Sequence, residues 1–318
     1  MTSKLRSTLR TVTVLACLPY LSLKVAWIAG SRVGIPDGST LLDHRTTMAV
    51  ANGITVLLDG AVILLAFLLT RPWGRRVPAW ALAVPMWVAT GLLTPIMTGY
   101  PAQLIVQAFD GSGGGSRPSE PFLDDWVFAV VYPGFIAQGL CLGALFVGYA
   151  RERWGGVWQG RVRELPVRPQ DAAQRLIAVG AALLAVLPVT THLLWACGMD
   201  AGLNAARAAE RDSTYYVMET FNALYLVAAV AGAVLLTFRR GRVLTLKVPL
   251  ALLWVGSGAA ACWGGWLALA SLSGVDDLSR QPTPLMNLTY AGQMIVGLLV
   301  VTIGAHHAAA RRTTPVPA

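Results

Sequence analysis

The sequence predicts an all-α polytopic membrane protein with eight transmembrane helices. Of its 318 residues, 55% are hydrophobic and only 13% are charged, whereas a soluble domain carries about 25% charged residues. The mean hydropathy is +0.57. A helix needs about 20 mostly apolar residues to cross a hydrocarbon core ~30 Å thick. The chain has such runs at 9–29, 47–70, 78–99, 126–149, 176–198, 215–238, 248–272 and 286–310.

The distribution of Lys and Arg predicts how these helices are oriented. If the N-terminus is cytoplasmic, the inner segments hold 18 of the 25 basic residues and the outer segments hold 6. Because short cytoplasmic loops are enriched in Lys and Arg, both termini are expected in the cytoplasm. The inner segments are 1–10, 71–78, 150–175, 238–247 and 306–318.

The net charge of +9 is therefore mainly a consequence of topology. We expect a multi-pass protein of a cell membrane, with the lipid bilayer as its surroundings. Nucleic acid is not an expected partner, because no loop combines a basic run with stacking aromatic residues.

Four pairs of similar segments recur in the same order along the chain. "KVAWIAG" (24–30) resembles "HLLWACG" (192–198), so that Trp27 and Trp195 are 168 residues apart. In each of the other three pairs, a segment of the first half of the chain is similar to a segment of the second half. They are "LLT" (68–70) with "LLT" (235–237), "WVATG" from Trp87 with "WVGSG" from Trp254, and "FIAQ" ending at Gln138 with "YAGQ" ending at Gln293.

This order predicts an internal duplication. The first four-helix repeat spans 1–149, a basic cytoplasmic linker spans 150–175, and the second four-helix repeat spans 176–318. Each half begins in the cytoplasm, so the repeats are expected to be parallel and related by an axis along the membrane normal.

Polar residues on the second helix of each half are the main candidates for function. Asp59, in the stretch "ITVLLDGAVILLAFLLT" (54–70), lies about midway along the second apolar run (47–70), and a charge at that depth costs about 2.5–3.5 kcal/mol on insertion scales. Asn52 and Thr55 lie on the same helical face as Asp59. At an offset of 167, Glu219 corresponds to Asn52 and Asn222 to Thr55. Two acids at different heights suit a division between proton donor and charge stabiliser.

Four further polar residues lie at similar depth. Lys24 and His192 each precede a repeated tryptophan by three residues, and Gln138 and Gln293 lie on the fourth helices. We expect these, together with Asn52, Thr55 and Asn222, to bind or orient a substrate. Structural roles remain open: Lys24 could extend to the membrane surface, His192 could be a hydrogen-bonded core residue, and the glutamines could link helices.

Structural alternatives also exist for the two acids. Asp59 could form a salt bridge with Lys24 or a hydrogen bond with Gln138, and Glu219 could be a rim residue.

Several familiar chemistries have no support in the sequence. It contains no phosphate-binding loop or dinucleotide fingerprint, no zinc-binding HExxH or spaced His/Cys set, and no DxxxD diphosphate–magnesium motif in a cytoplasmic loop. No cofactor or metal is therefore expected. The four cysteines fall in apolar segments and are expected to be buried free thiols. They are Cys17, Cys141, Cys197 and Cys262.

Two resemblances add expectations about function. "LKVAWIAG" (23–30), with the preceding "LPY" (18–20), resembles a Lys-x-x-Trp-x-x-Gly pattern of actinobacterial eight-helix membrane proteins. As a small all-helical chain with two intramembrane acids, the protein is also loosely similar to integral-membrane terpene cyclases. That similarity implies that Asp59 and Glu219 are catalytic residues that protonate an olefin or epoxide.

The leading hypothesis is thus a membrane enzyme that cyclises a lipophilic isoprenoid-type substrate by acid initiation. A proton-coupled small-molecule transporter or exporter is the alternative, because parallel repeats and membrane acids also suit transport. A non-enzymatic membrane component is the third possibility.

Overall fold

The computed structural model describes residues 1–37, 39, 45–109, 123–166, 171–272 and 279–312. Among these residues, eight helices are long and apolar enough to cross a membrane, and no strand is present. Each predicted apolar run overlaps one of them. The prediction of an all-helical, polytopic membrane protein is confirmed at this level.

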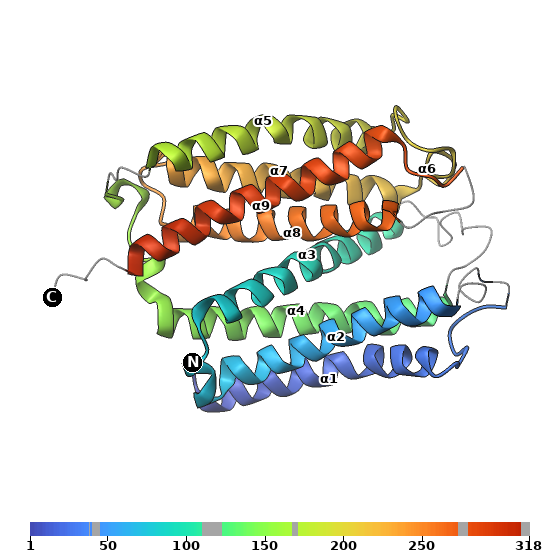
Figure 1. Cartoon of the computed structure of the whole chain (residues 1–318). Helices are drawn as coiled ribbons and strands as arrows, with labels where there is room; N and C mark the ends of the chain where they lie inside the picture. The colour runs from blue at the N-terminus through green and yellow to red at the C-terminus, as the bar shows by residue number, and fades with distance from the viewer. Residues whose placement is uncertain (38, 40–44, 110–122, 167–170, 273–278, 313–318) are drawn as a thin grey trace. The chain divides into compact units, whose positions relative to one another are not determined.

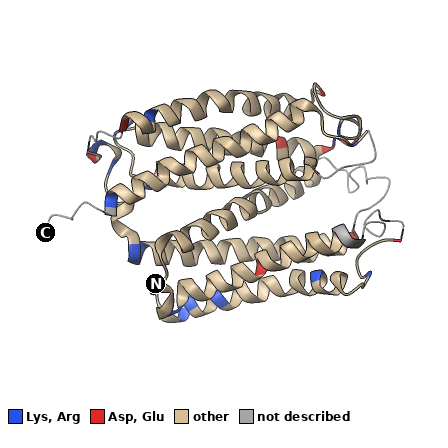
Figure 2. Cartoon of the chain, viewed as in Figure 1, with Lys and Arg blue, Asp and Glu red and all other residues tan. Residues whose placement is uncertain are grey.

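The long helices are α1 (Ser3–Ile28), α2 (Arg45–Thr70), α3 (Ala79–Phe109), α4 (Asp125–Trp154), α5 (Asp171–Ala196), α7 (Ser213–Thr237), α8 (Lys247–Leu272) and α9 (Pro284–Arg312). The short elements are η2 (Pro72–Arg76), η3 (Gly155–Val157), η4 (Val162–Glu164) and α6 (Ala205–Ala209). Charged residues concentrate toward the helix ends, as the membrane requires (Figure 2).

One helix end differs clearly from the prediction. The third apolar run ends at residue 99, but α3 continues to Phe109. Hydropathy locates the part of a helix that lies in lipid, whereas the helix itself continues as long as its residues favour helical backbone. The segment Gln103–Phe109 contains no Gly or Pro to end it.

The chain divides into two compact units. The first contains Met1–Ala89, Ile96–Pro101 and Gln107–Arg153, and the second contains Thr90–Pro95, Ala102–Val106 and Trp154–Ala318. The first unit thus contains α1, α2, α4 and much of α3, and the second contains α5 to α9. We describe each unit by itself.

In the second unit, α5, α7, α8 and α9 pack side by side as a bundle (Figure 1). Glycines bring the helix backbones into direct contact. A Cβ on Gly256 of α8 would lie 2.5 Å from the Ala229 nitrogen of α7, and one on Gly264 would lie 2.6 Å from the Met294 nitrogen of α9. Small residues allow this close approach, which is the usual source of helix association in lipid.

In the first unit, α4 contacts α1, α2 and part of α3. Tyr20 of α1 and Phe135 of α4 meet edge to face, with ring centroids 4.8 Å apart. Gly139 of α4 lies directly against the Met97 side chain of α3. Helix α2 turns one polar face toward the interior of the unit, where Asn52 and Asp59 are each only 4% exposed.

Helices α1 and α5 end in the same local structure. The Trp27 indole Nε1 donates to the Val33 carbonyl oxygen at 2.7 Å, and the Trp195 Nε1 donates to the Ala201 carbonyl oxygen at 3.1 Å. In both cases the acceptor lies six residues after the tryptophan. The indole thereby ties the chain beyond the helix to its last turn.

Glycines in the left-handed region make both of these turns possible. Gly30 and Gly198 have φ values of +93° and +87°, and Gly34 and Gly202 have +76° and +75°. A residue with a Cβ disfavours this backbone region, so glycine is the ordinary choice. All four positions pair at the 168-residue offset that relates the two tryptophans.

We expect Gly256→Ala to lower the free energy of unfolding by about 1–3 kcal/mol, because the added methyl group meets the α7 backbone. Thermal unfolding in detergent, followed by circular dichroism, measures the effect. Gly180→Ala on α5 is the matched control, since nothing lies within 4 Å of its Cβ position. Equal destabilisation by the two substitutions would contradict close α7–α8 packing.

Candidate functional site

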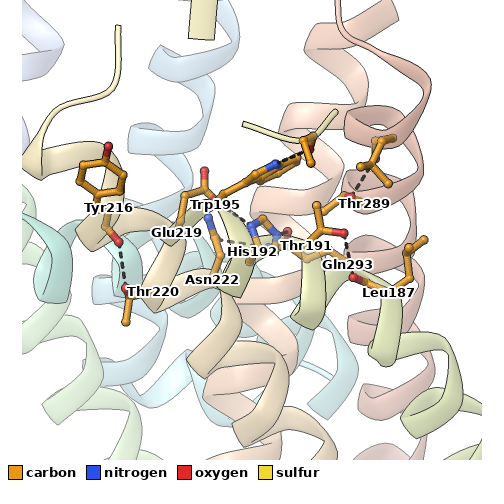
Figure 3. Close-up of polar contacts among 12 residues, drawn as sticks. Leu187, Thr191, His192, Trp195, Tyr216, Glu219, Thr220, Asn222, Thr289 and Gln293 are labelled. Atoms are coloured by element: carbon orange, nitrogen blue, oxygen red, sulfur yellow. Dashed lines mark hydrogen bonds and ion pairs between the residues drawn. The ribbon is translucent and has the colours of Figure 1, made fainter. Parts of the chain in front are cut away.

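The second unit contains a buried hydrogen-bonded network centred on His192 of α5. His192 is 0% exposed, and its Nδ1 lies 2.5 Å from Oε2 of Glu219 on α7. Its Nε2 lies 2.9 Å from Oε1 of Gln293 on α9. Figure 3 shows the imidazole between these two side chains. Three helices therefore meet at one histidine.

The network fixes the proton on one of the two ring nitrogens, Nε2. Gln293 donates through Nε2 to Oδ1 of Asn222 at 3.4 Å, so its Oε1 is turned toward His192. That oxygen accepts from Nε2–H of the imidazole, as an amide carbonyl can only accept. The Nδ1–Glu219 hydrogen bond then holds one shared proton. The pair is either a neutral imidazole with a carboxylic acid or an imidazolium with a carboxylate.

The tryptophan at the end of α5 positions this histidine. Trp195 is 0% exposed and packs edge to face against His192, with ring centroids 5.6 Å apart. Its indole also bonds to the turn that follows α5, so Trp195 links the last turn of the helix both to His192 and to the chain beyond. The histidine one turn earlier is fixed with it.

The first unit contains a second polar cluster, built on α1, α2 and α4. Lys24 donates through Nζ to Oδ1 of Asn52 at 2.9 Å. Its ammonium group lies 4.7 Å from the centroid of the Tyr20 ring and 4.8 Å from that of Trp27, within range for cation–π attraction. Lys24 is therefore directed into the unit and does not extend to the membrane surface.

Asp59 lies in the same cluster. Its carboxyl forms a side-chain hydrogen bond with Gln138 of α4 and interacts electrostatically with Lys24. Three buried polar atoms of this cluster have no hydrogen-bond partner: Asn52 Nδ2, Asp59 Oδ2 and Gln138 Oε1. Leaving such atoms unpaired costs about 1–3 kcal/mol each, so their presence together marks a candidate site.

The structure thus places the predicted site residues in two groups. Lys24 with Asn52 and Asp59 with Gln138 belong to the first unit, where the Thr55 hydroxyl donates to the Asn52 carbonyl at 2.8 Å. The second unit contains His192, Glu219, Asn222 and Gln293. Glu219 is 5% exposed, so it is not a rim acid.

Two tyrosines in these groups were missed by the sequence analysis. Tyr20 contacts Lys24, and the buried Tyr215 hydroxyl, near Glu219, has no hydrogen-bond partner. Each precedes its charged neighbour by four residues on the same helix, and that spacing could have identified both.

The cysteines are free thiols as expected, but their burial differs. Cys17 is buried, Cys141 and Cys262 are half-buried, and Cys197 is exposed. Cys197 follows the last residue of α5, so the apolar segment predicted to bury it has already ended. Among the residues described, no group of three or more His, Cys, Asp or Glu side chains is placed to hold a metal ion.

Fold and site together define the class of the protein as a helical polytopic membrane protein with buried polar clusters. Comparisons with protein-family models, with curated proteins and with solved structures give no match to the chain.

We expect Glu219→Leu to destabilise the protein by about 3–5 kcal/mol, because removing one partner leaves the other buried polar group unpaired. Glu219→Gln should cost less, since an amide N–H can donate to the neutral imidazole Nδ1. Thermal unfolding of both variants in detergent measures the difference. Exposed Glu210→Leu is the control and should change stability by no more than about 0.5 kcal/mol. Equal losses for the Leu and Gln variants at 219 would argue against the hydrogen bond.

Proposed function

We propose that the protein is a membrane-embedded enzyme that protonates a lipophilic, isoprenoid-type substrate and so initiates its cyclisation. Asp59 is the general acid in this proposal. The observation that carries it is the unpartnered Oδ2 of a carboxyl that is only 4% exposed. In this proposal the acid carries its proton on Oδ2, where no neighbouring side chain accepts it.

The neighbours of Asp59 suit this role. Gln138 bonds to the carboxyl and so fixes its orientation. The proton on Oδ2 passes to an olefin carbon or an epoxide oxygen, and the positive charge that forms on carbon is attacked by a second double bond. The carboxylate left behind is stabilised by the Lys24 charge and takes back the proton lost in the last step. General acids of this kind contribute about 10²–10⁴-fold to a rate.

Glu219 is the second acid of the proposal. Its hydrogen bond to His192 gives its proton an acceptor, unlike that of Asp59, so we assign it the supporting role of charge stabiliser. Asn52 and Asn222 orient polar groups beside the two acids.

A specific observation also favours the alternative of proton-coupled transport. Chains of Asp, Glu and His inside membranes commonly serve as proton relays. The Glu219–His192 pair, joined at 2.5 Å and almost fully buried, has the composition of one.

The duplication and the orientation of the chain belong to the same proposal. The matching indole hydrogen bonds of Trp27 and Trp195 support two parallel four-helix repeats. The excess of Lys and Arg in the segments assigned to the inside supports cytoplasmic termini.

We expect Asp59→Asn to reduce turnover of a terminal-olefin or terminal-epoxide prenylated aromatic compound by about 100-fold or more. The asparagine keeps the shape of the side chain but has no acidic proton to deliver. Membranes that contain the full chain are assayed for cyclised product by mass spectrometry. Glu210→Gln, which removes an exposed acid, is the matched control.

The same variants distinguish the two candidate functions. If Asp59→Asn leaves turnover unchanged, or if no substrate of this class is converted by the wild type, the acid mechanism is wrong. Proton uptake by proteoliposomes that is lost in Glu219→Gln would then establish the transport alternative.

Orientation is tested with the exposed Cys197. If the N-terminus is cytoplasmic, the end of α5 faces outward, and a membrane-impermeant maleimide should label Cys197 in intact cells. Cys197→Ser should abolish that labelling, since the other three cysteines lie within spans. Labelling that appears only after the cells are permeabilised would reverse the assignment.

A further inference from the structure

A cavity of about 60 Å³ lies at one end of the second unit, away from the His192 network. Its walls come from the start of α5, the end of α7 and the end of α9. Polar side chains lining it include Asp171 and Gln174 from α5, Arg239 after α7, and His306 and Arg311 from α9. None of these residues takes part in the proposed function.

The lining is predominantly basic. Its described residues include two arginines and two histidines against one carboxylate, that of Asp171. Arg239 holds this carboxylate with a hydrogen bond of 2.5 Å from Nη2 to Oδ2, and the same Nη2 donates to the Pro166 carbonyl at 2.7 Å. The lining therefore has a net charge of +1 with neutral histidines, and of +3 when both are protonated.

The depth of the cavity matches the polar headgroup layer. Three candidate spans have ends here, at Asp171, at Thr237 and at Arg311, so the cavity lies where the hydrocarbon region meets water. Part of its wall is apolar, from Leu165, Leu236 and Ile303. A basic pocket with an apolar side, between transmembrane helices at this depth, is the form that anionic lipid headgroups occupy.

The size also fits a small anion. About 10–15 Å³ of such volume holds one water molecule, so the cavity has room for a group of a few heavy atoms such as a phosphate. The side-chain oxygen of Gln174 is buried here without a hydrogen-bond partner. A half-turn rotation of that amide would present its N–H₂ group to an anion, because the amide oxygen and nitrogen are similar in size and shape.

We propose that this cavity binds the phosphate group of an anionic phospholipid, with Arg311 and His306 as its main contacts. Arg239 is a positioning residue, because its pairing with Asp171 and Pro166 holds the ends of α5 and α7 together. This site is independent of the acid chemistry at Asp59.

The test uses the purified full-length protein in detergent, with phosphatidylglycerol, phosphatidylcholine or inorganic phosphate added separately. Binding is followed by native mass spectrometry and by the thermal midpoint. We expect phosphatidylglycerol to bind several-fold more tightly than phosphatidylcholine. Each basic residue at the membrane surface is worth about a fivefold change in affinity, so Arg311→Gln should weaken phosphatidylglycerol binding about fivefold.

Arg175→Gln is the matched control, because it removes the same charge next to Gln174 from a side chain that does not line the cavity. It should retain wild-type binding. His306→Gln provides a second variant if Arg311→Gln fails to fold by circular dichroism and gel filtration. Equal binding of the two lipids, or equal losses in the Arg175 and cavity variants, overturns the proposal. If inorganic phosphate binds as tightly as phosphatidylglycerol, the ligand is a free anion and the lipid part of the proposal is wrong.

Discussion

The structure depends on one constraint: a polar group buried in a membrane protein must find its partner within the protein. His192 meets it fully, because both ring nitrogens are engaged and the side chains around it hold one another in place. Asp59 meets it only in part, because one carboxyl oxygen bonds to Gln138 and the other has no partner. One polar centre is fully hydrogen-bonded within the protein, and the other is not.

Both centres rest on the same support, the tryptophan-linked turn at the end of α1 and α5. Lys24 and His192 lie three residues before their tryptophans, nearly one helical turn. What occupies that position differs: a flexible cation bonds to an amide in one unit, and a rigid imidazole bonds to a carboxyl in the other. A similar backbone arrangement thus carries two different chemistries, because the function of a site depends on its side chains and not on the fold.

The fold could be predicted from the sequence much further than the site could. Apolar runs and basic flanks located all eight long helices, since lipid leaves little choice of secondary structure. The hydrogen-bonded pairs could not be predicted in this way. Periodicity places Glu219 and Asn222 on one face, but the contact with His192 depends on how α5 and α7 pack. The Lys24–Asn52 hydrogen bond likewise depends on how the helices pack. The exposure of Cys197 depends on the residue at which α5 ends.

The closely packed glycines of α8 have a mechanical consequence. Where backbones touch without intervening side chains, as at Gly264, no soft layer exists to absorb displacement. Helix α9, held in this way, carries Gln293 in the buried network and Arg311 eighteen positions further on, about 27 Å along its axis at 1.5 Å per residue. We therefore expect α9 to move as one rigid element, so that a rotation or translation at one end also displaces the other end.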